Sequence, residues 1–239
     1  LPISVSSFST LSTPNDPRYG ELYGLHNTGQ SGGTIDADIN APEAWQMSTG
    51  SRDLIVGVID TGIDYTHPDL AANMWVNPGE IAGNGIDDDA NGFVDDVHGY
   101  DFANDDGDPF DDNGHGTMMA GILVADEGYT GIARDVDLYV AKALSGSGGG
   151  DDETVAEAID WCVTSGVDII SLSLGGNASG FSIILGDAVE DAVDAAIKMM
   201  HSNLTGPINV GSDVDVNLTD LANMIIANTE STSKITYSE

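Results

Sequence analysis

The chain has 239 residues, with 6 Lys and Arg against 40 Asp and Glu, which gives a formal net charge of -34 at pH 7. This length suits one mid-sized domain with a sizeable core, and the charge excludes nucleic acids and anionic membranes as partners because their phosphates would be repelled. The charge favours hard divalent cations that take oxygen ligands, although a solvated acidic surface, as in proteins built for high salt, explains most of the carboxylates equally well.

Strand-like and helix-like segments alternate along the chain, which predicts an α/β fold with a parallel sheet. A continuous apolar run, typical of a strand buried on both faces, gives the expected strand at residues 54–59, and two further strands are expected at 136–143 and 167–174. Apolar residues at helical spacing, and a Pro in the first turn of the first segment, give the expected helices: residues 41–45, 116–124, 151–165 and 187–200. The helix at 116–124 is apolar on nearly all sides, so we expect it to be buried, with Met118 and Met119 in the core.

Cys162 is the single cysteine, so no intrachain disulfide forms. It lies in the expected helix at 151–165, where we expect it to be a small core residue. No run of the sequence is long and apolar enough to span a membrane. The chain begins at Leu1 without a basic and apolar leader, so we expect any signal peptide to have been removed or never to have been part of this sequence.

Residues 76–112 form a long segment rich in Asp, Asn and Gly, which we expect to supply little core and to be either functional or organised by an ion. From Asp87 the sequence fits the opening of an EF-hand-like calcium loop, with oxygen donors at the first, third and fifth positions, Gly at the sixth, a carbonyl at the seventh and an acid at the ninth. Position twelve, usually a bidentate Glu, is His98, so the loop would close differently, through Asp96.

The pattern predicts Ca2+ rather than zinc, which prefers clusters of His and Cys. The expected ligands are Asp87, Asp89, Asn91, Phe93 through its carbonyl, Asp95 and Asp96. An acidic loop without an ion is the open alternative. A second site from a neighbouring acidic run rests on composition alone, and its residues are Asp105, Asp106, Asp108, Asp111 and Asp112.

Two short motifs carry nucleophilic chemistry. Asp60 ends an apolar strand, and the Thr-Gly that follows turns its carboxylate toward the crevice at the carboxyl edge of the sheet, where ligands of open parallel sheets bind. His115 opens a helix whose positive end disfavours an imidazolium, but a carboxylate on one ring nitrogen offsets this and leaves the other nitrogen to act as a base. Asp60 and His115 are therefore expected to be two members of a Ser/His/Asp constellation.

Aspartic proteases also use Asp-Thr-Gly, as a pair of carboxylates that share a proton. This chain has one such motif, and only a symmetric homodimer would supply the second. The histidine motif and the long alternation of strands and helices argue against that class.

Three motifs of the chain resemble those of the subtilisin-like serine proteases, the subtilases, and occur in the family's order. Ile-Val-Gly-Val-Ile-Asp-Thr-Gly-Ile at 55–63, followed by His-Pro-Asp-Leu at 67–70, is similar to the aspartate motif. Asn-Gly-His-Gly-Thr at 113–117 is similar to the histidine motif, and residues 166–176 resemble the strand that lines the primary specificity pocket. The resemblance implies a three-layer α/β fold with a mostly parallel central sheet flanked by helices.

By that resemblance Asp60 orients His115, and His115 is the general base and acid. An extended peptide or protein substrate would add as a strand between two walls of the cleft. The wall residues that the resemblance implies are Ser173, Leu174 and Gly175 on one side and Gly148, within residues 144–148, on the other. It further implies a secreted, monomeric endopeptidase with calcium sites and an inhibitory propeptide.

The chain departs from the family at the nucleophile. The family's Gly-Thr-Ser-Met-Ala motif does not occur in it, and Gly-Thr-Met-Met-Ala at 116–120 belongs to the histidine motif, with Met where the Ser would stand. Asn203 falls where the family has the asparagine that helps to stabilise the oxyanion. We therefore expect a subtilase that is truncated or degenerate before the catalytic serine, incomplete at its C-terminus and of low stability alone.

Two other functions stay open: a non-catalytic, calcium-stabilised peptide-binding relative and a plain acidic α/β binding protein. The expected organisation is a tail or linker at 1–14, a partial peptidase domain at 15–228 with the acidic insertion at 76–112, and a polar tail at 229–239.

Overall fold

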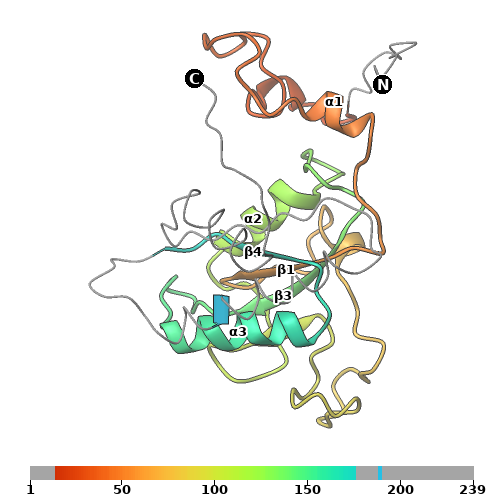
Figure 1. Ribbon diagram of the computed structural model, residues 1–239, viewed down its shortest axis with the longest axis vertical. Helices are drawn as coiled ribbons and strands as arrows, with labels where there is room; N and C mark the ends of the chain where they lie inside the picture. Colours follow the sequence, from red (N-terminus) through yellow and green to blue (C-terminus); the bar gives the residue numbers. More distant parts are fainter. Residues whose placement is uncertain (1–13, 176–187, 190–239) are drawn as a thin grey trace, which may run out of the picture.

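The computed structural model describes residues 14–175 together with residues 188 and 189. Within them four parallel strands form one sheet in the order β2-β3-β1-β4 (Figure 1). The strands are β1 (Ile55–Asp60), β2 (Gly99–Asp101), β3 (Asp137–Lys142) and β4 (Ile169–Leu172). The central position of β1 follows from its continuous apolar run, which suits a strand covered on both faces.

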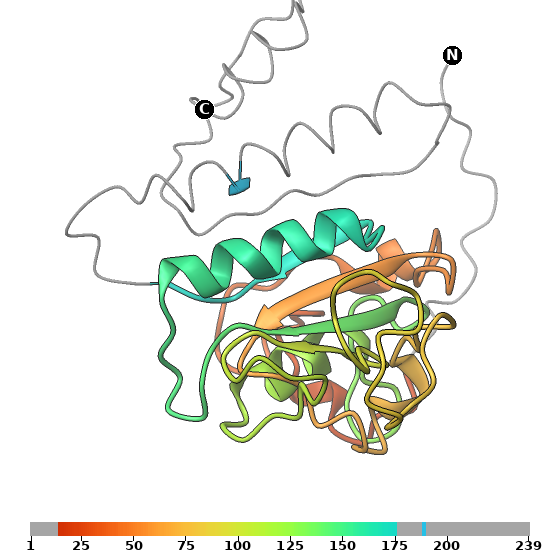
Figure 2. The same ribbon diagram turned by 90° about the horizontal axis from the view of Figure 1, so that it is seen from below.

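Helices lie on both faces of this sheet, so the described part of the chain has three layers. Figures 1 and 2 show α2 on one side of the strands and α3 on the other. The α-helices are α1 (Ala41–Trp45), α2 (His115–Val124) and α3 (Asp152–Thr164), and the short 3-10 helices are η1 (Tyr19–Glu21) and η2 (Ala71–Asn73). The α/β fold with a parallel sheet is as the sequence predicts.

The alternation of side chains along β1 explains the two cores. Val56 and Val58 pack in one cluster with Ala120 and Val124 of α2, whereas Ile59 packs in the other with the apolar stripe of α3. Because successive side chains of a strand point to opposite faces, one short segment contributes to both layers. The end of β1 is thereby fixed from two sides.

The contact between β1 and α3 depends on Gly57. A Cβ atom at this position would lie 2.8 Å from Cys162 Sγ and 3.0 Å from Val167 Cγ1. Cys162 is fully buried, which confirms its expected place in the core, and burial raises the pKa of its thiol. The start of α3 is fixed by the Asp151 carboxylate, which accepts hydrogen bonds from the amide (2.9 Å) and hydroxyl (2.6 Å) of Thr154.

The acidic segment supplies more core than the sequence suggests. It contains β2, which the sequence analysis did not predict, and its aromatic residues Phe93, Tyr100 and Phe102 form edge-to-face contacts with one another and, for Phe93 and Phe102, with Trp161 of α3. The expectation that this segment contributes little core is therefore wrong. The aromatic side chains are few and separated by acids, so the apolar pattern along the sequence is weak although their contact area is large.

The expectation that α2 is buried on nearly all sides is also wrong. Gly116, Ala120 and Val124 are buried, but Met118 is 62% exposed and Ile122 53% exposed. The sheet covers only one stripe of a helix, and composition alone does not reveal whether a second layer covers the rest.

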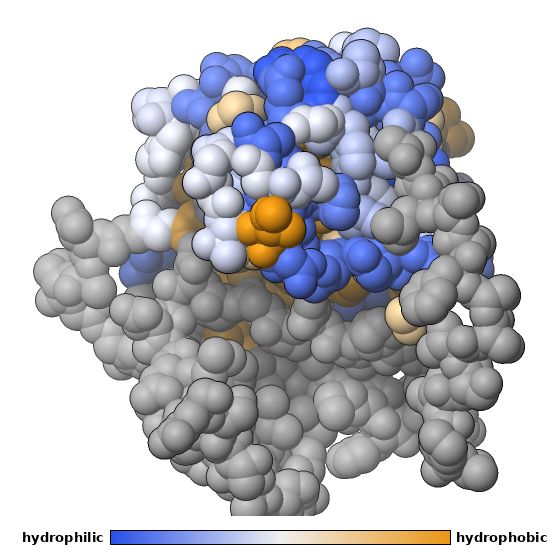
Figure 3. Space-filling view, turned by 90° about the horizontal axis from the view of Figure 1, so that it is seen from above, coloured by the Kyte–Doolittle hydropathy of each residue, from blue (hydrophilic) through white to orange (hydrophobic). Residues whose placement is uncertain are grey.

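Several expected features lie outside the described residues. They are Asn203, residues 1–13 of the expected N-terminal tail, the polar tail at 229–239, and the helix at 187–200 apart from residues 188 and 189. In the part of the chain that the structure describes, no helix is long and apolar enough to cross a lipid bilayer. The face shown in Figure 3 is largely hydrophilic over its described atoms, in keeping with the charge of the chain.

We expect Gly57→Ala to lower the free energy of unfolding by about 1–3 kcal/mol, because the added methyl group forces β1 and α3 apart. Urea denaturation of the full chain measures this change. Gly20→Ala is the control, since no atom lies within 4 Å of a Cβ atom built there. If both variants lost the same free energy of unfolding, the close contact at Gly57 would not be the cause of the loss.

Candidate active site

Asp60 is the last residue of β1, and its carboxylate is buried. The residue is 1% exposed, and its Oδ1 accepts a hydrogen bond of 2.7 Å from the Thr61 amide. The chain then turns through Gly62 at φ +101°, where a Cβ atom would lie 2.5 Å from the Pro109 carbonyl oxygen. Both the left-handed backbone and this close approach require glycine, so the Asp-Thr-Gly sequence fixes where the carboxylate lies.

His115 is the first residue of α2 and faces this carboxylate. Its Nδ1 lies 2.8 Å from Asp60 Oδ1 and 3.0 Å from Oδ2. The helix starts after Gly114, which has φ +104°, and the approach of α2 to β1 requires Gly116, where a Cβ atom would lie 2.1 Å from the Gly62 carbonyl oxygen. The structure thus brings together the two residues that the sequence analysis singled out.

The two ends of the imidazole ring differ in environment. The His115 side chain is 41% exposed, whereas the Asp60 side chain is 1% exposed. A buried carboxylate bound to Nδ1 selects the tautomer with its proton on that nitrogen, and Nε2 is left as the basic atom. Among the described residues, no hydrogen bond to Nε2 is formed. The arrangement can take a proton from a group that approaches from the exposed side.

The first turn of α2 is held by a third acid, Asp111. This residue is 8% exposed, and its carboxylate accepts hydrogen bonds from the amides of Asn113 (3.0 Å), Gly114 (2.8 Å) and Thr117 (2.9 Å). Burial raises the pKa of Asp111, but these amides and the Thr117 hydroxyl outweigh it, and the pKa lies below its usual value. The sequence analysis placed Asp111 only in a candidate second metal site.

Lys142 is a buried cation at the same edge of the sheet. It pairs with Asp60 in the register of β1 and β3 and is 2% exposed. Its Nζ lies 3.1 Å from the Phe110 carbonyl oxygen, 2.5 Å from Asp112 Oδ1 and 3.9 Å from Asp101 Oδ2. A buried ammonium group needs such partners, so Lys142 anchors the segment before α2. The available signal was a Lys among the largely apolar residues 136–143.

The residues expected to line a cleft follow the same edge. Ser173 and Leu174 are half-buried and Gly175 is exposed, and they come directly after Leu172, which pairs with Ile59 next to Asp60. On the other side, Gly148 has φ +79° and its amide bonds to the Ser145 carbonyl at 2.7 Å in a tight turn.

One side chain links this turn to the histidine motif. Asn113 Nδ2 donates to the Gly146 carbonyl oxygen at 3.0 Å. The two expected walls therefore flank the edge at which Asp60 and His115 lie, and the turn is tied to the segment that carries the histidine.

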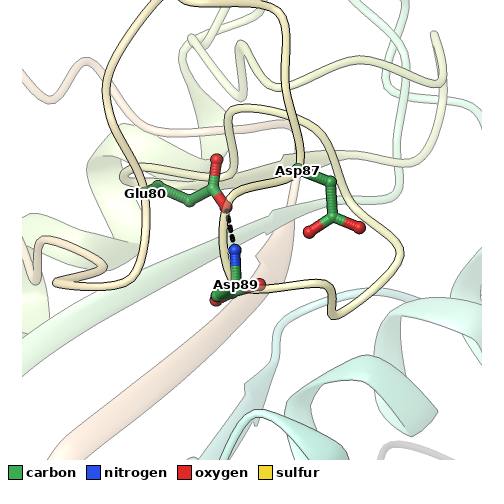
Figure 4. A group of neighbouring side chains, drawn as sticks. All are labelled: Glu80, Asp87 and Asp89. Atoms are coloured by element: carbon green, nitrogen blue, oxygen red, sulfur yellow. Dashed lines mark hydrogen bonds between the residues drawn. The ribbon is translucent and has the colours of Figure 1, made fainter.

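Three carboxylates of the acidic segment converge on one point. The side chains of Glu80, Asp87 and Asp89 each offer an oxygen within 4.8 Å of the others (Figure 4). Asp87 and Asp89 were expected ligands, but Glu80 was missed because it precedes the loop motif and approaches only through the fold. Its Oε1 accepts hydrogen bonds from the amides of Asp88 (2.8 Å) and Asp89 (3.2 Å).

The carboxylates of Asp95 and Asp96, also expected ligands, lie outside this group, whereas Asn91 adjoins it, since its backbone amide donates to Asp87 Oδ1 and Asp89 Oδ1, both at 3.0 Å. Asp95 accepts hydrogen bonds from the amides of Asn84 (3.1 Å) and Gly85 (2.9 Å). Asp96 is fully buried and accepts from Asn77, Asn91 and Tyr139. Burial raises the pKa of Asp96 although these three side chains oppose the shift. The Phe93 side chain lies in the aromatic core, and Asn91 accepts through its Oδ1 from the Phe93 amide at 2.8 Å.

The second acidic run does not gather around one point either. Asp105 accepts from the Tyr100 hydroxyl at 2.9 Å, and Asp108 accepts from the Tyr65 hydroxyl at 2.8 Å. Desolvation and these carboxylates raise the pKa of each tyrosine to about 12. Among the described residues, the group of Glu80, Asp87 and Asp89 is the candidate cation site.

We expect Asp111→Asn to destabilise the protein by about 1–3 kcal/mol at pH 7, because a charged acceptor of several amides is lost. A carboxyl group whose pKa is depressed by folding contributes stability above its unfolded pKa, near 3.9, and loses it as the pH falls through its folded value. The difference in unfolding free energy between wild type and variant should therefore shrink below about pH 4.

Chemical denaturation from pH 7 to pH 3 at constant calcium measures this trend. Asp53→Asn removes an equal charge from an exposed position outside the site and serves as the control. A difference between wild type and Asp111→Asn that stays constant over the whole range would show that ionisation of Asp111 contributes nothing.

The sequence comparisons with known proteins agree on one family. The sequence profile of the subtilase family matches residues 51–212. The halolysin-like extracellular serine protease Nep of Natrialba magadii is 36% identical over 177 residues, which cover 71% of this chain and 27% of that protein. Subtilisin-like protease 1 of Plasmodium berghei is 35% identical, over 69% of this chain and 28% of that protein. A thermophilic serine proteinase of Bacillus sp. is also 35% identical, over 70% of this chain and 35% of that protein.

A solved structure agrees with these sequence matches. The crystal structure of a cold-adapted subtilisin-like serine proteinase superposes with a TM-score of 0.50 at 26% identity, over 73% of this chain and 52% of that one. This chain spans between 27% and 35% of the lengths of the three relatives. The resemblance at the three motifs is thus confirmed over most of the chain, and the chain belongs to the subtilase family.

Proposed function

We propose that this chain forms the part of a subtilisin-type serine endopeptidase that carries its general base. The observation that supports this most directly is the pair of Asp60 and His115, in which a buried carboxylate bonds Nδ1 at 2.8 Å while the ring is 41% exposed. Such a pair activates a hydroxyl nucleophile. The relatives are serine proteases by name, in keeping with the same chemistry.

In the proposed reaction, His115 Nε2 takes the proton of a serine hydroxyl as that oxygen attacks the carbonyl carbon of a peptide bond. His115 then gives the proton to the leaving amine when the acyl-enzyme forms, and it repeats both steps with water in deacylation. Asp60 stays ionised and stabilises the imidazolium. No serine among the described residues is hydrogen-bonded to His115, so these residues account for the base and its orientation.

The proposed substrate is an extended peptide or a protein segment. Residues 173–175 continue from β4 and residues 144–148 continue from β3, so their backbones run out from the sheet on either side of the catalytic pair. A peptide placed between them would gain main-chain hydrogen bonds as an added strand. An extracellular location is part of the proposal, supported by the relative that is an extracellular protease by name.

We also propose a calcium ion at Glu80, Asp87 and Asp89. Oxygens within 4.8 Å of one another fit ligands of one ion, because Ca2+ binds oxygen at about 2.3–2.6 Å and takes six to eight such ligands. Glu80 already bridges Asp88, Asp89 and Asp95 through their amides, so an ion there would stabilise most of the loop. Its role is to neutralise the carboxylates, and it takes no part in the proton transfers.

A fluorophosphonate probe tests the proposed activity. We expect the gene product that carries this chain to give one adduct by intact mass, and Asp60→Asn to slow labelling by about 10⁴-fold, because the wrong tautomer is then favoured. His115→Ala should slow it at least as much, and Asp53→Asn should leave the rate unchanged. If the wild-type gene product gives no adduct and cleaves no peptide with calcium present, the proposal is wrong and a non-catalytic peptide-binding role is favoured.

Thermal unfolding tests the calcium site. We expect calcium at about 100 times its Kd to add about 2.7 kcal/mol, with a matching rise in Tm. In Asp87→Asn this gain should largely disappear, measured against the Tm of the same variant in chelator, because the substitution itself both relieves repulsion and weakens the bonds from the Asn91 and Gly92 amides. Asp108→Asn, which removes an acid outside the group, is the control. An unchanged calcium response in Asp87→Asn would rule out this site.

A further inference from the structure

One carboxylate bonds to both catalytic motifs. Asp111 Oδ1 accepts from the Thr61 hydroxyl at 2.9 Å, and its Oδ2 accepts from the amide (2.9 Å) and hydroxyl (2.5 Å) of Thr117. Thr61 follows Asp60 directly, and Thr117 lies in the first turn of the helix that His115 begins. A single buried acid thus bonds the residue next to the catalytic carboxylate and the helix that carries the catalytic imidazole.

Thr61 also bonds directly to the helix that carries His115. Its Oγ1 donates to Asp111 and accepts a hydrogen bond of 3.0 Å from the amide of Gly116, the residue after His115. Its own amide donates to Asp60 Oδ1. The hydroxyl can accept from Gly116 and donate to Asp111 at the same time because it has one proton and two lone pairs.

The Thr117 hydroxyl extends the connection to the chain after the aspartate motif. Thr117 Oγ1 donates to Asp111 and accepts from the Asp64 amide at 2.9 Å. Both threonine hydroxyls therefore have the same orientation, with the proton toward Asp111 and a lone pair toward a backbone amide. That orientation requires an acceptor at Asp111, which an ionised carboxylate supplies with both oxygens.

We propose that Asp111 is a positioning residue that sets the distance between Asp60 and His115. The inference rests on the proposed function, in which the contact of 2.8 Å between these two residues orients the base. Geometry of this kind is sensitive, since a displacement of about 1 Å costs about 100-fold in rate. Asp111 touches neither the reacting atoms nor the imidazole, so its effect passes through Thr61 and through the first turn of α2.

Two variants separate positioning from the loss of a charge. Asp111→Asn leaves one oxygen and places an amide nitrogen, which cannot accept, against Thr61 or Thr117. Thr61→Val breaks the link between the two motifs without any change in charge and with nearly the same side-chain shape. Asp16→Asn is the matched control, because Asp16 is also buried, at 5% exposure, and accepts hydrogen bonds from Arg18 and Thr130 away from the site.

The first readout is the proton on His115 Nδ1, observed by NMR after ¹⁵N-histidine labelling of the gene product that carries this chain. We expect its downfield resonance to shift upfield or vanish in Asp111→Asn and in Thr61→Val, and to stay in place in Asp16→Asn. The double variant of Asp111 and Thr61 should show less than the sum of the two single changes, because both substitutions remove the hydrogen bond between Thr61 and Asp111. Should either single variant fail to fold, the other still decides.

The second readout is peptide hydrolysis. We expect kcat to fall at least tenfold in Asp111→Asn and in Thr61→Val with KM within twofold of the wild-type value, and both constants to stay within twofold in Asp16→Asn. An unchanged Nδ1 proton resonance in the two site variants overturns the inference, and so does an unchanged kcat. A wild-type protein without hydrolytic activity overturns the proposed function alone, since the resonance decides on Asp111 by itself.

Discussion

The site depends on one constraint: the carboxylate of Asp60 lies buried at the end of a strand that is covered on both faces. A buried charge is tolerated only where donors replace water, because its desolvation costs several kcal/mol. The Thr61 amide and the His115 imidazole supply those donors. They reach Asp60 because Gly62 turns the chain sharply and Gly116 lets α2 approach the backbone. The low polarity that makes this burial costly also strengthens the hydrogen bond that orients the imidazole.

The carboxylates of this acidic chain are stabilised mainly by hydrogen bonds rather than by ion pairs. With 6 basic residues against 40 acidic ones, cations are scarce, and one of them, Lys142, is buried where Asp101 and Asp112 crowd the sheet edge. Elsewhere backbone amides serve as donors, as they do for Asp111 at the start of α2 and Asp151 at the start of α3. At both helix starts the positive end of the helix favours the ionised acid. For the buried Asp111, such donors outweigh desolvation and hold the pKa below its usual value.

The parts of this fold that the sequence predicts are those in which local chemistry is decisive. An apolar run and the Gly of the turn after it suffice to place β1 and Asp60, and the histidine motif places His115 at a helix start. Phe93 and Glu80 illustrate what is not predictable, because each acts through partners that are distant in sequence and share no periodicity with it. Asp111 is a third kind of case: it lies in an acidic run whose composition does not reveal which carboxylate faces inward.

The part of the chain that holds His115 in place matters for the proposed function. The side-chain hydrogen bonds that join Asp60, Thr61, Asp111 and His115 come from residues 60–117, whereas the amides of Ala143 and Leu144 bond the Asp60 carbonyl. Among the described residues, the side chains that orient the imidazole thus belong to the aspartate and histidine motifs and to the segment between them. In the proposed reaction, a base held in this way would not need to reorient when the substrate binds, which would lower the cost of catalysis.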